Sequence, residues 1–267
     1  MKPVLIDTHA HLTDERLAGD ISQVLAKARE AGVAAVINAG YNMDSSRAVY
    51  SLAGSCAPCY AVVGIQPSEA PQALGAELGE IATMLAHPKV VGIGEIGLDY
   101  YWNAHPKEVQ MAAFVRQIEL AKEFKVPFVV HDRDAHGDIL EALNRCAPYP
   151  QGFVMHCFSG SPEFAEICVK LGGYISLAGP VTFRNAVKPA RVAASVPLER
   201  LLLETDCPYL TPHPYRGQLN HPAYLPLIAE RIAELRGLTL AQVAAQTTAN
   251  ACLVFGLKEV SESWLEI

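Results

Sequence analysis

Eight short runs of β-branched and other apolar residues alternate with longer stretches of helical period along this chain. Parallel strands need a long crossover, usually a helix, so this alternation predicts a parallel sheet. We expect strands near residues 4–9, 34–39, 60–66, 90–96, 126–131, 152–157, 173–178 and 201–206. At roughly 33 residues per strand–helix unit, the pattern fits a closed (β/α)8 TIM barrel.

The stretches between and after these strands predict helices. We expect them near residues 20–31, 45–53, 76–86, 107–124, 134–146, 162–171, 185–194, 222–236 and 239–253. Barrels of this size often run undivided, so residues 1–267 are expected to form a single barrel domain. The main alternative is an open doubly wound sheet, but its Gly-rich phosphate fingerprint is missing after the first strand.

The composition indicates which classes of function this chain can have. Apolar residues make up 51% of the chain and charged residues 18%, which is enough to bury a large core. The net charge of −7 argues against broad electrostatic adhesion to nucleic acid. Nucleic acid is not excluded as a substrate, because metal ions can supply positive charge where it is needed.

The cysteines and the apolar runs bear on location. The seven cysteines are odd in number and scattered, which suits a reducing compartment better than a disulfide framework. No secretory signal is visible, and no apolar run reaches the roughly 18 residues that span a bilayer. We therefore expect a cytoplasmic protein without a membrane partner.

Residues of metal-ligating type stand at the carboxyl ends of five expected strands: His9, His11, Glu95, His131, His156 and Asp206. Buried imidazoles and carboxylates are costly unless they are paired or coordinate a cation. Barrel enzymes place their chemistry at these strand ends, so the ligands are expected to converge. Nitrogen and oxygen ligands suit zinc, manganese or magnesium, and six ligands predict two divalent ions about 3.5–4 Å apart.

Alternate residues of a barrel strand face the interior, so His9 and His11 share one side of the first strand. Asp7 has the same parity and is a candidate for orienting an imidazole. Cys157 and Cys207 have the opposite parity to the neighbouring ligands and are expected to pack toward the helices.

Two carboxylates are candidates for distinct roles in this site. Glu95 is the natural bridge between two ions, and Asp206 can bind one ion while accepting a proton from activated water.

Five segments carry a resemblance to a known family: Asp7-Thr8-His9-Ala10-His11, Gly94-Glu95-Ile96-Gly97-Leu98-Asp99, His131-Asp132-Arg133-Asp134-Ala135, His156-Cys157-Phe158-Ser159-Gly160 and Glu204-Thr205-Asp206-Cys207-Pro208-Tyr209-Leu210. With them the chain resembles the TatD family of metal-dependent deoxyribonucleases, within the amidohydrolase-like barrel hydrolases. The resemblance runs from about residue 4 to 257. It implies a nuclease that uses two divalent ions, with Glu95 between two ligand groups: His9, His11 and Asp206, and His131 and His156.

The resemblance also implies a substrate-binding side of the site. Arg133 and Arg216 would face phosphate oxygens, a role that the forked donors of guanidinium suit, and Ser159 would lie beside them. One position departs from the family pattern: where the family has Gly-x-His-Pro, this chain has Gly64-Ile65-Gln66-Pro67. Gln66 cannot carry a proton near neutral pH, so we expect it to contact substrate rather than metal.

These observations predict a monomeric, metal-dependent phosphodiesterase that trims DNA ends in the 3′–5′ direction, with Asp206, Glu95 and Arg133 as catalytic residues. A small-molecule amidohydrolase or deaminase on the same barrel is the first alternative, although a neutral amide needs no arginine. A catalytically idle binding module is the second. Six intact ligands argue against it, and Gln66 keeps it open.

Overall fold

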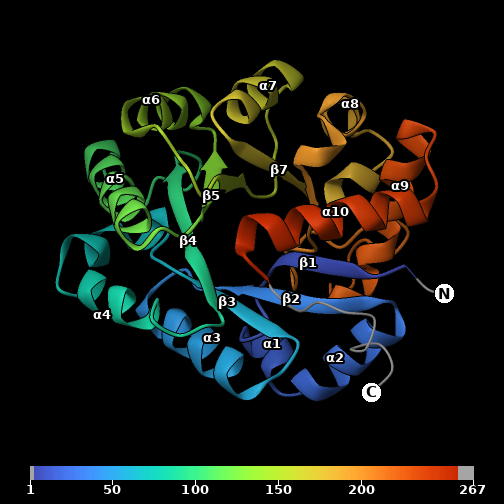
Figure 1. The fold of residues 1–267 in the computed structure, drawn as a ribbon, viewed down its shortest axis with the longest axis horizontal. Helices are drawn as coiled ribbons and strands as arrows, with labels where there is room; N and C mark the ends of the chain where they lie inside the picture. The colour runs from blue at the N-terminus through green and yellow to red at the C-terminus, as the bar shows by residue number, and fades with distance from the viewer. Residues whose placement is uncertain (1–2, 258–267) are drawn as a thin grey trace.

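The computed structural model describes residues 3–257 and contains one parallel sheet of eight strands in sequential order (Figure 1). The strands are β1 (Leu5–Ala10), β2 (Val33–Ala39), β3 (Cys59–Val63), β4 (Val90–Asp99), β5 (Phe128–Arg133), β6 (Phe153–Met155), β7 (Gly173–Leu177) and β8 (Leu201–Leu203). A parallel bridge between Ala10 and Cys207 joins the first and last edges, so the barrel is nearly closed. The predicted (β/α)8 barrel is confirmed, and the open doubly wound sheet is wrong.

Helices surround this sheet (Figure 1). They are α1 (Glu15–Ala18), α2 (Ile21–Glu30), α3 (Met43–Ser55), α4 (Glu77–Met84), α5 (Lys107–Phe124), α6 (His136–Cys146), α7 (Pro162–Lys170), α8 (Val187–Ser195), α9 (Leu225–Arg236) and α10 (Leu240–Phe255). Short 3-10 helices lie at η1 (Pro67–Leu74), η2 (Gly179–Thr182), η3 (Leu198–Arg200) and η4 (Pro222–Tyr224). All nine helices expected from the sequence are present, and α1 was not expected.

Local sequence sets several helix ends. Helix α10 begins with a capping box. The Thr239 side chain accepts from the backbone N–H of Gln242, and the Gln242 side chain accepts from the backbone N–H of Thr239. Helices α9 and α10 each end at a glycine with positive φ, Gly237 and Gly256, which is the common way to stop a helix. Local sequence therefore accounts for both ends of α10 and for the C-terminal end of α9.

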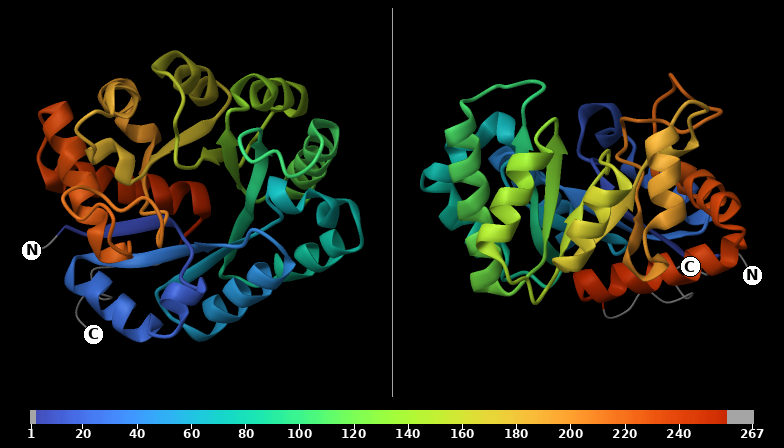
Figure 2. Two further views of the ribbon diagram at one scale, coloured as in Figure 1. Left: turned by 180° about the vertical axis from the view of Figure 1, so that it is seen from behind. Right: turned by 90° about the horizontal axis from the view of Figure 1, so that it is seen from above.

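The apolar residues form two layers. Ile37 of β2 and its neighbours of the same parity fill the barrel interior, whereas Val36 packs against the surrounding helices. Val254 and Phe255 of α10 join the interior layer, so this helix closes the end of the barrel where the strands begin. Figure 2 (right) shows α10, in red, at one end and the long orange segment after β8 at the other. The open end is therefore the one where the strands terminate.

Strand lengths differ slightly from expectation. Strand β4 continues to Asp99 because Gly97, Leu98 and Asp99 stay paired with β5, while β6 and β8 end before their predicted ligands. Within residues 3–257 there is no helix whose length and apolar character would let it span a bilayer.

Candidate metal centre

The six predicted ligands lie together at the open end of the barrel. His9 belongs to β1, and His11 follows it directly. The His9 Nε2 atom lies 3.3 Å from His11 Nε2 and 3.3 Å from Glu95 Oε2, and His11 Nε2 lies 3.5 Å from Asp206 Oδ1. These three contacts place two imidazoles and two carboxylates around one point.

The other oxygen of Glu95 faces a second pair of imidazoles. Glu95 Oε1 lies 2.9 Å from His131 Nδ1 and 3.8 Å from His156 Nε2. The two imidazole nitrogens are 3.4 Å apart. Each carboxylate oxygen of Glu95 is thus directed at a different histidine pair, which is the arrangement expected of a bridging ligand.

The donor set fits divalent metal. The ligand atoms of His9, His11 and Asp206 lie within 4.8 Å of one another, and so do those of His9, Glu95 and His156. A neutral imidazole offers one donor and one acceptor, so it can satisfy only part of such a cluster by hydrogen bonding. The Nδ1 atom of the fully buried His9 has no hydrogen-bond partner, which leaves its orientation dependent on what Nε2 binds.

The electrostatics of the site favour two ionised carboxylates, which can bind a cation. Burial alone raises the pKa of Glu95, but the imidazoles of His156 and His131 outweigh it and hold the pKa well below its usual range. Burial also opposes the ionisation of Asp206, and a hydrogen bond from His11 outweighs it, so the pKa is lowered. Two buried carboxylates therefore stay ionised at neutral pH, as metal ligands must.

Two of the four imidazoles, those of His131 and His11, are oriented by acceptors behind them. His131 Nε2 lies 3.0 Å from Asp99 Oδ2. His156 Nδ1 lies 3.4 Å from Glu204 Oε1 but forms no hydrogen bond there. His11 Nδ1 lies 3.1 Å from a backbone carbonyl, that of Ala39. Burial lowers the pKa of His131, but hydrogen bonds to Asp99 and Glu95 outweigh it and raise the pKa to about 10. Such partners fix the tautomer and direction of a ligand imidazole.

Asp99 was not predicted to have this orienting role, although the sequence contained the signal. Asp99 has the same strand parity as Glu95 and Gly97, and it pairs with Arg133 of β5, two residues beyond the pair of Gly97 with His131. The alternation rule that placed the ligands would have placed its carboxylate beside them.

Asp7 does not orient an imidazole, so that prediction is wrong. Its carboxylate accepts from the backbone N–H of Thr205 at 2.9 Å, from the Thr205 hydroxyl at 2.5 Å and from the backbone N–H of His9 at 3.3 Å. Asp7 instead holds the chain after β8 against β1. Burial raises the pKa of Asp7 to about 7.

Cys157 does not pack toward the helices, so the parity argument fails for it. Strand β6 ends at Met155, and the φ of +43° at Cys157 breaks the alternation. Burial, together with the nearby charges of Asp206 and Glu204, raises the pKa of the Cys157 thiol well above its usual range. Cys207, by contrast, is fully buried in the layer between barrel and helices, as expected.

The four predicted substrate contacts stand at or after the ends of β3, β5, β6 and β8, with different surroundings. Arg133 is exposed, with its guanidinium 4.3 Å from the ring centre of Tyr101, and Ser159 is also exposed. Arg216 is exposed and lies 4.1 Å above the ring of Phe183. The half-buried Gln66 stands at the start of η1, just past β3. Its amide donates to Ser68 Oγ at 2.9 Å, and Gln66 is in neither candidate ligand group.

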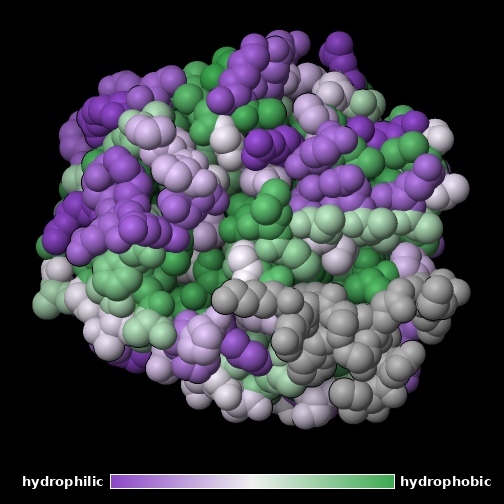
Figure 3. All heavy atoms as spheres, viewed as in Figure 1, coloured by the Kyte–Doolittle hydropathy of each residue, from purple (hydrophilic) through white to green (hydrophobic). Residues whose placement is uncertain are grey.

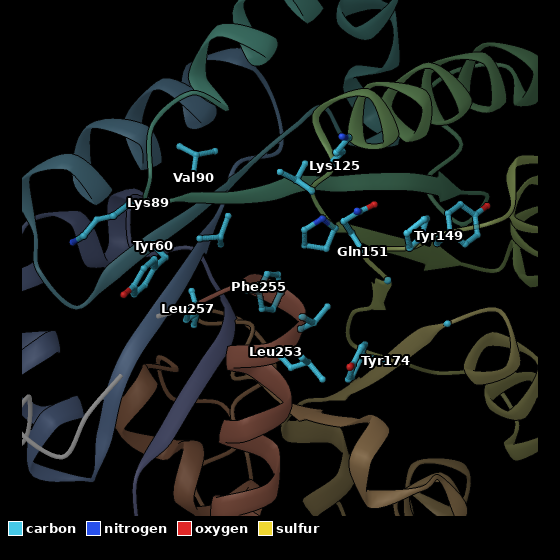
Figure 4. A pocket seen from close by; sticks show the side chains of 18 of the residues that line it. Tyr60, Lys89, Val90, Lys125, Tyr149, Gln151, Tyr174, Leu253, Phe255 and Leu257 are labelled. Atoms are coloured by element: carbon cyan, nitrogen blue, oxygen red, sulfur yellow. The ribbon is translucent and has the colours of Figure 1, made fainter. Parts of the chain in front are cut away.

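A separate cavity of about 980 Å³ lies at the opposite end, where the strands begin (Figure 4). It is lined by Tyr60, Val90 and Tyr174 near strand starts and by Leu253 and Phe255 of α10. Hydrophobic side chains gather over this part of the surface (Figure 3), where Leu253 is 74% exposed. None of the six candidate metal ligands lines this cavity.

Comparison with known proteins agrees with this geometry. The family model described as TatD related DNase matches residues 6–256. The uncharacterized metal-dependent hydrolase YabD of Bacillus subtilis is 42% identical over 94% of this chain and 99% of its own length. The 3′-5′ ssDNA/RNA exonuclease TatD of Escherichia coli is 36% identical over 95% of this chain and 99% of its own length.

A solved structure shows the same fold. The TatD homologue YJJV of Escherichia coli superimposes with a TM-score of 0.88 at 31% identity, covering 96% of this chain and all of that one. The resemblance expected from the five sequence segments is confirmed. The chain belongs to the TatD-related DNase family of metal-dependent hydrolases.

Proposed function

We propose that this protein is a metal-dependent phosphodiesterase that removes nucleotides from the 3′ ends of DNA. The observation that carries the proposal is the position of Glu95 between two imidazole pairs, with one carboxylate oxygen directed at each. Two-ion sites of this kind suit displacement at phosphorus, because both attacking and leaving oxygens are stabilised. Relatives named 3′-5′ exonucleases support the polymer substrate and its polarity.

The chain's own residues divide the work. His9, His11 and Asp206 would hold one ion, His131 and His156 the other, and Glu95 both. When bound, the ions supply Lewis acidity and lower the pKa of water. Asp206 is ionised at neutral pH and accepts the proton of the attacking water. Arg133 stands exposed beside His131 and offers a guanidinium to the phosphate.

The test is direct hydrolysis of defined polymers. Protein reconstituted with magnesium, manganese or zinc is incubated with 5′-end-labelled single- and double-stranded DNA and RNA, and the products are separated by length. A ladder that shortens from the 3′ end, absent with Asp206→Asn, supports the proposal. A single internal cut would replace trimming by endonuclease cleavage. If the protein leaves every polymer intact but hydrolyses small amides or lactones, an amidohydrolase is favoured instead.

We place this activity in a monomeric single-domain protein of the cytoplasm. The seven free cysteines support a reducing compartment. One sheet receives strands from both ends of the described chain, which supports a single domain. Light scattering at working concentration tests the oligomeric state, and a mass near twice 28.8 kDa would contradict a monomer.

A further inference from the structure

Exposed aromatic side chains concentrate at the mouth of the barrel. Within residues 3–257, four of the five exposed aromatics lie in the segments after β4 and β8: Tyr101, Trp102, Tyr209 and Tyr215. The fifth, Phe124, ends α5, whose C-terminus points to the closed end of the barrel. Apolar side chains that are exposed together on one face mark a candidate binding surface, whereas singly scattered ones do not.

The first group stands beside His131. Trp102 is 71% exposed, and its backbone N–H donates at 2.9 Å to Asp99 Oδ1, while Asp99 Oδ2 binds His131. The ring of Tyr101 meets that of Trp102 edge-on at 5.1 Å and stacks against the guanidinium of Arg133. One carboxylate thus fixes both a metal ligand and the turn that presents an indole to solvent.

The second group stands beside His11. The ring of Tyr209 lies 6.1 Å from the His11 imidazole and is 47% exposed. The guanidinium of Arg16 lies 4.5 Å above the same ring, and the Tyr209 hydroxyl donates to Asp14 at 3.4 Å. Here again an aromatic face and an arginine occur together at the edge of the ligand cluster.

The two groups lie on opposite walls of the mouth. In a barrel of eight sequential strands, β4 and β8 are four positions apart and therefore face each other. Six ligands lie between them. A chain crossing the mouth from one wall to the other would pass over the metal centre, with rings and cations at both sides.

We infer that Trp102 and Tyr209 are stacking platforms for two bases of a nucleic-acid strand that crosses the metal centre. The inference rests on the proposed function and assigns two residues that hold its substrate. Bases in a duplex have their faces covered by neighbours, whereas an unpaired base can stack on an aromatic ring. Arg133, held against the ring of Tyr101, supplies a phosphate contact for such a strand, whereas the Arg16 guanidinium already donates to both carboxylate oxygens of Asp14 at 2.8 Å.

The test measures binding without metal, so it does not depend on turnover. Protein in EDTA is titrated with a labelled oligothymidylate, its hairpin duplex counterpart and an abasic oligomer with the same phosphates. We expect the single strand to bind tightest. Trp102→Ala should weaken its binding about 5- to 100-fold, as loss of one stacked base predicts, and should leave abasic binding unchanged. Trp102→Tyr should restore most of the loss.

Phe124→Ala is the matched control, because it removes an exposed ring at the other end of the barrel and should bind like the wild type. Wild-type protein that binds none of the oligomers, or Trp102→Ala that weakens the abasic oligomer as much as the single strand, would overturn the inference. If binding depends on the Trp102 ring but protein reconstituted with metal cleaves none of the oligomers, the proposed hydrolysis is contradicted and the stacking platforms are supported.

Discussion

Glu95 influences more of this site than any other single residue. Its two oxygens contact both histidine pairs, and its backbone N–H donates to the Gly40 carbonyl at 2.7 Å, which fixes the middle of β4 against the chain after β2. The carboxylate is buried and surrounded by imidazoles that keep it ionised. A neutral substitute would remove the negative charge shared by both groups.

Asp206→Asn should abolish hydrolysis more thoroughly than it removes metal. The amide still offers a carbonyl oxygen, but it accepts no proton. Loss of the general base is expected to lower the rate roughly 10²- to 10⁴-fold. Turnover and metal content measured on the same preparation check this. Near-normal turnover of a phosphodiester would place the base elsewhere.

Gln66→Ala should leave bound metal unchanged and slow turnover by an amount equivalent to one hydrogen bond, about 0.5–1.5 kcal/mol. The reason is its place at the start of η1, outside the candidate ligand groups. Gln66→His should restore the family residue. It should also add a titration to the pH–rate profile near the unperturbed histidine pKa of about 6.5. Metal loss in Gln66→Ala would show that the ligand set is incomplete.

Asp7→Asn should change the pH dependence of stability. In the folded protein the pKa of Asp7 is about 7, above its unfolded value, so folding favours its protonated form. In the wild type the free energy of unfolding should therefore fall as the pH rises from the unfolded pKa of Asp7 to its folded pKa of about 7. In the variant it should fall less. Urea unfolding in EDTA at pH 5 and pH 8 measures the difference. Equal slopes would mean that Asp7 is ionised throughout.

At the scale of elements, the sequence predicted the strands well and the local geometry after them poorly. All eight strands and nine helices were expected, because period and length separate buried strands from amphipathic helices. Asp206 and Cys157 have positive φ just past short strands, and no alternation rule describes such residues. The ligands could be named from sequence, but the contacts of Asp7 and Trp102 depend on turns that propensity does not encode.

Gly97→Ala should disturb the site through strand β4. At Gly97 the φ is +147°, and a Cβ would lie 1.9 Å from the backbone oxygen of His131. The strands must separate to accept it, which is expected to destabilise the protein by about 1–3 kcal/mol and to weaken metal binding at His131. Calorimetry and metal analysis check both effects.

Gly79→Ala is the control for that substitution. Gly79 lies in α4, nothing lies within 4 Å of its added Cβ, and the change should stabilise the helix by about 0.5–1 kcal/mol. Wild-type stability and metal content in Gly97→Ala would show that β4 and β5 can separate without cost.

At the scale of the whole molecule, we expect two ions per chain at saturating manganese or zinc. The six predicted ligands exceed the three that one catalytic ion usually takes from protein, and Glu95 directs one oxygen at each histidine pair. Each bound ion should raise the melting temperature, because it binds only the folded form. Elemental analysis of the wild type and of His131→Ala, expected to keep one ion, tests the count. A wild type that saturates with one ion would contradict it.

The seam between β1 and β8 has a consequence for biosynthesis. The Asp206 backbone N–H donates to the His9 carbonyl, and the His11 N–H to that of Cys207, so the first and last strands complete the centre together. About 200 residues separate these partners. At a translation rate of about 5–20 residues per second, the ribosome adds Asp206 roughly 10–40 s after His11. During that interval the nascent chain carries His9 and His11 without Asp206, and it gains the complete centre only when the segment after the last strand emerges.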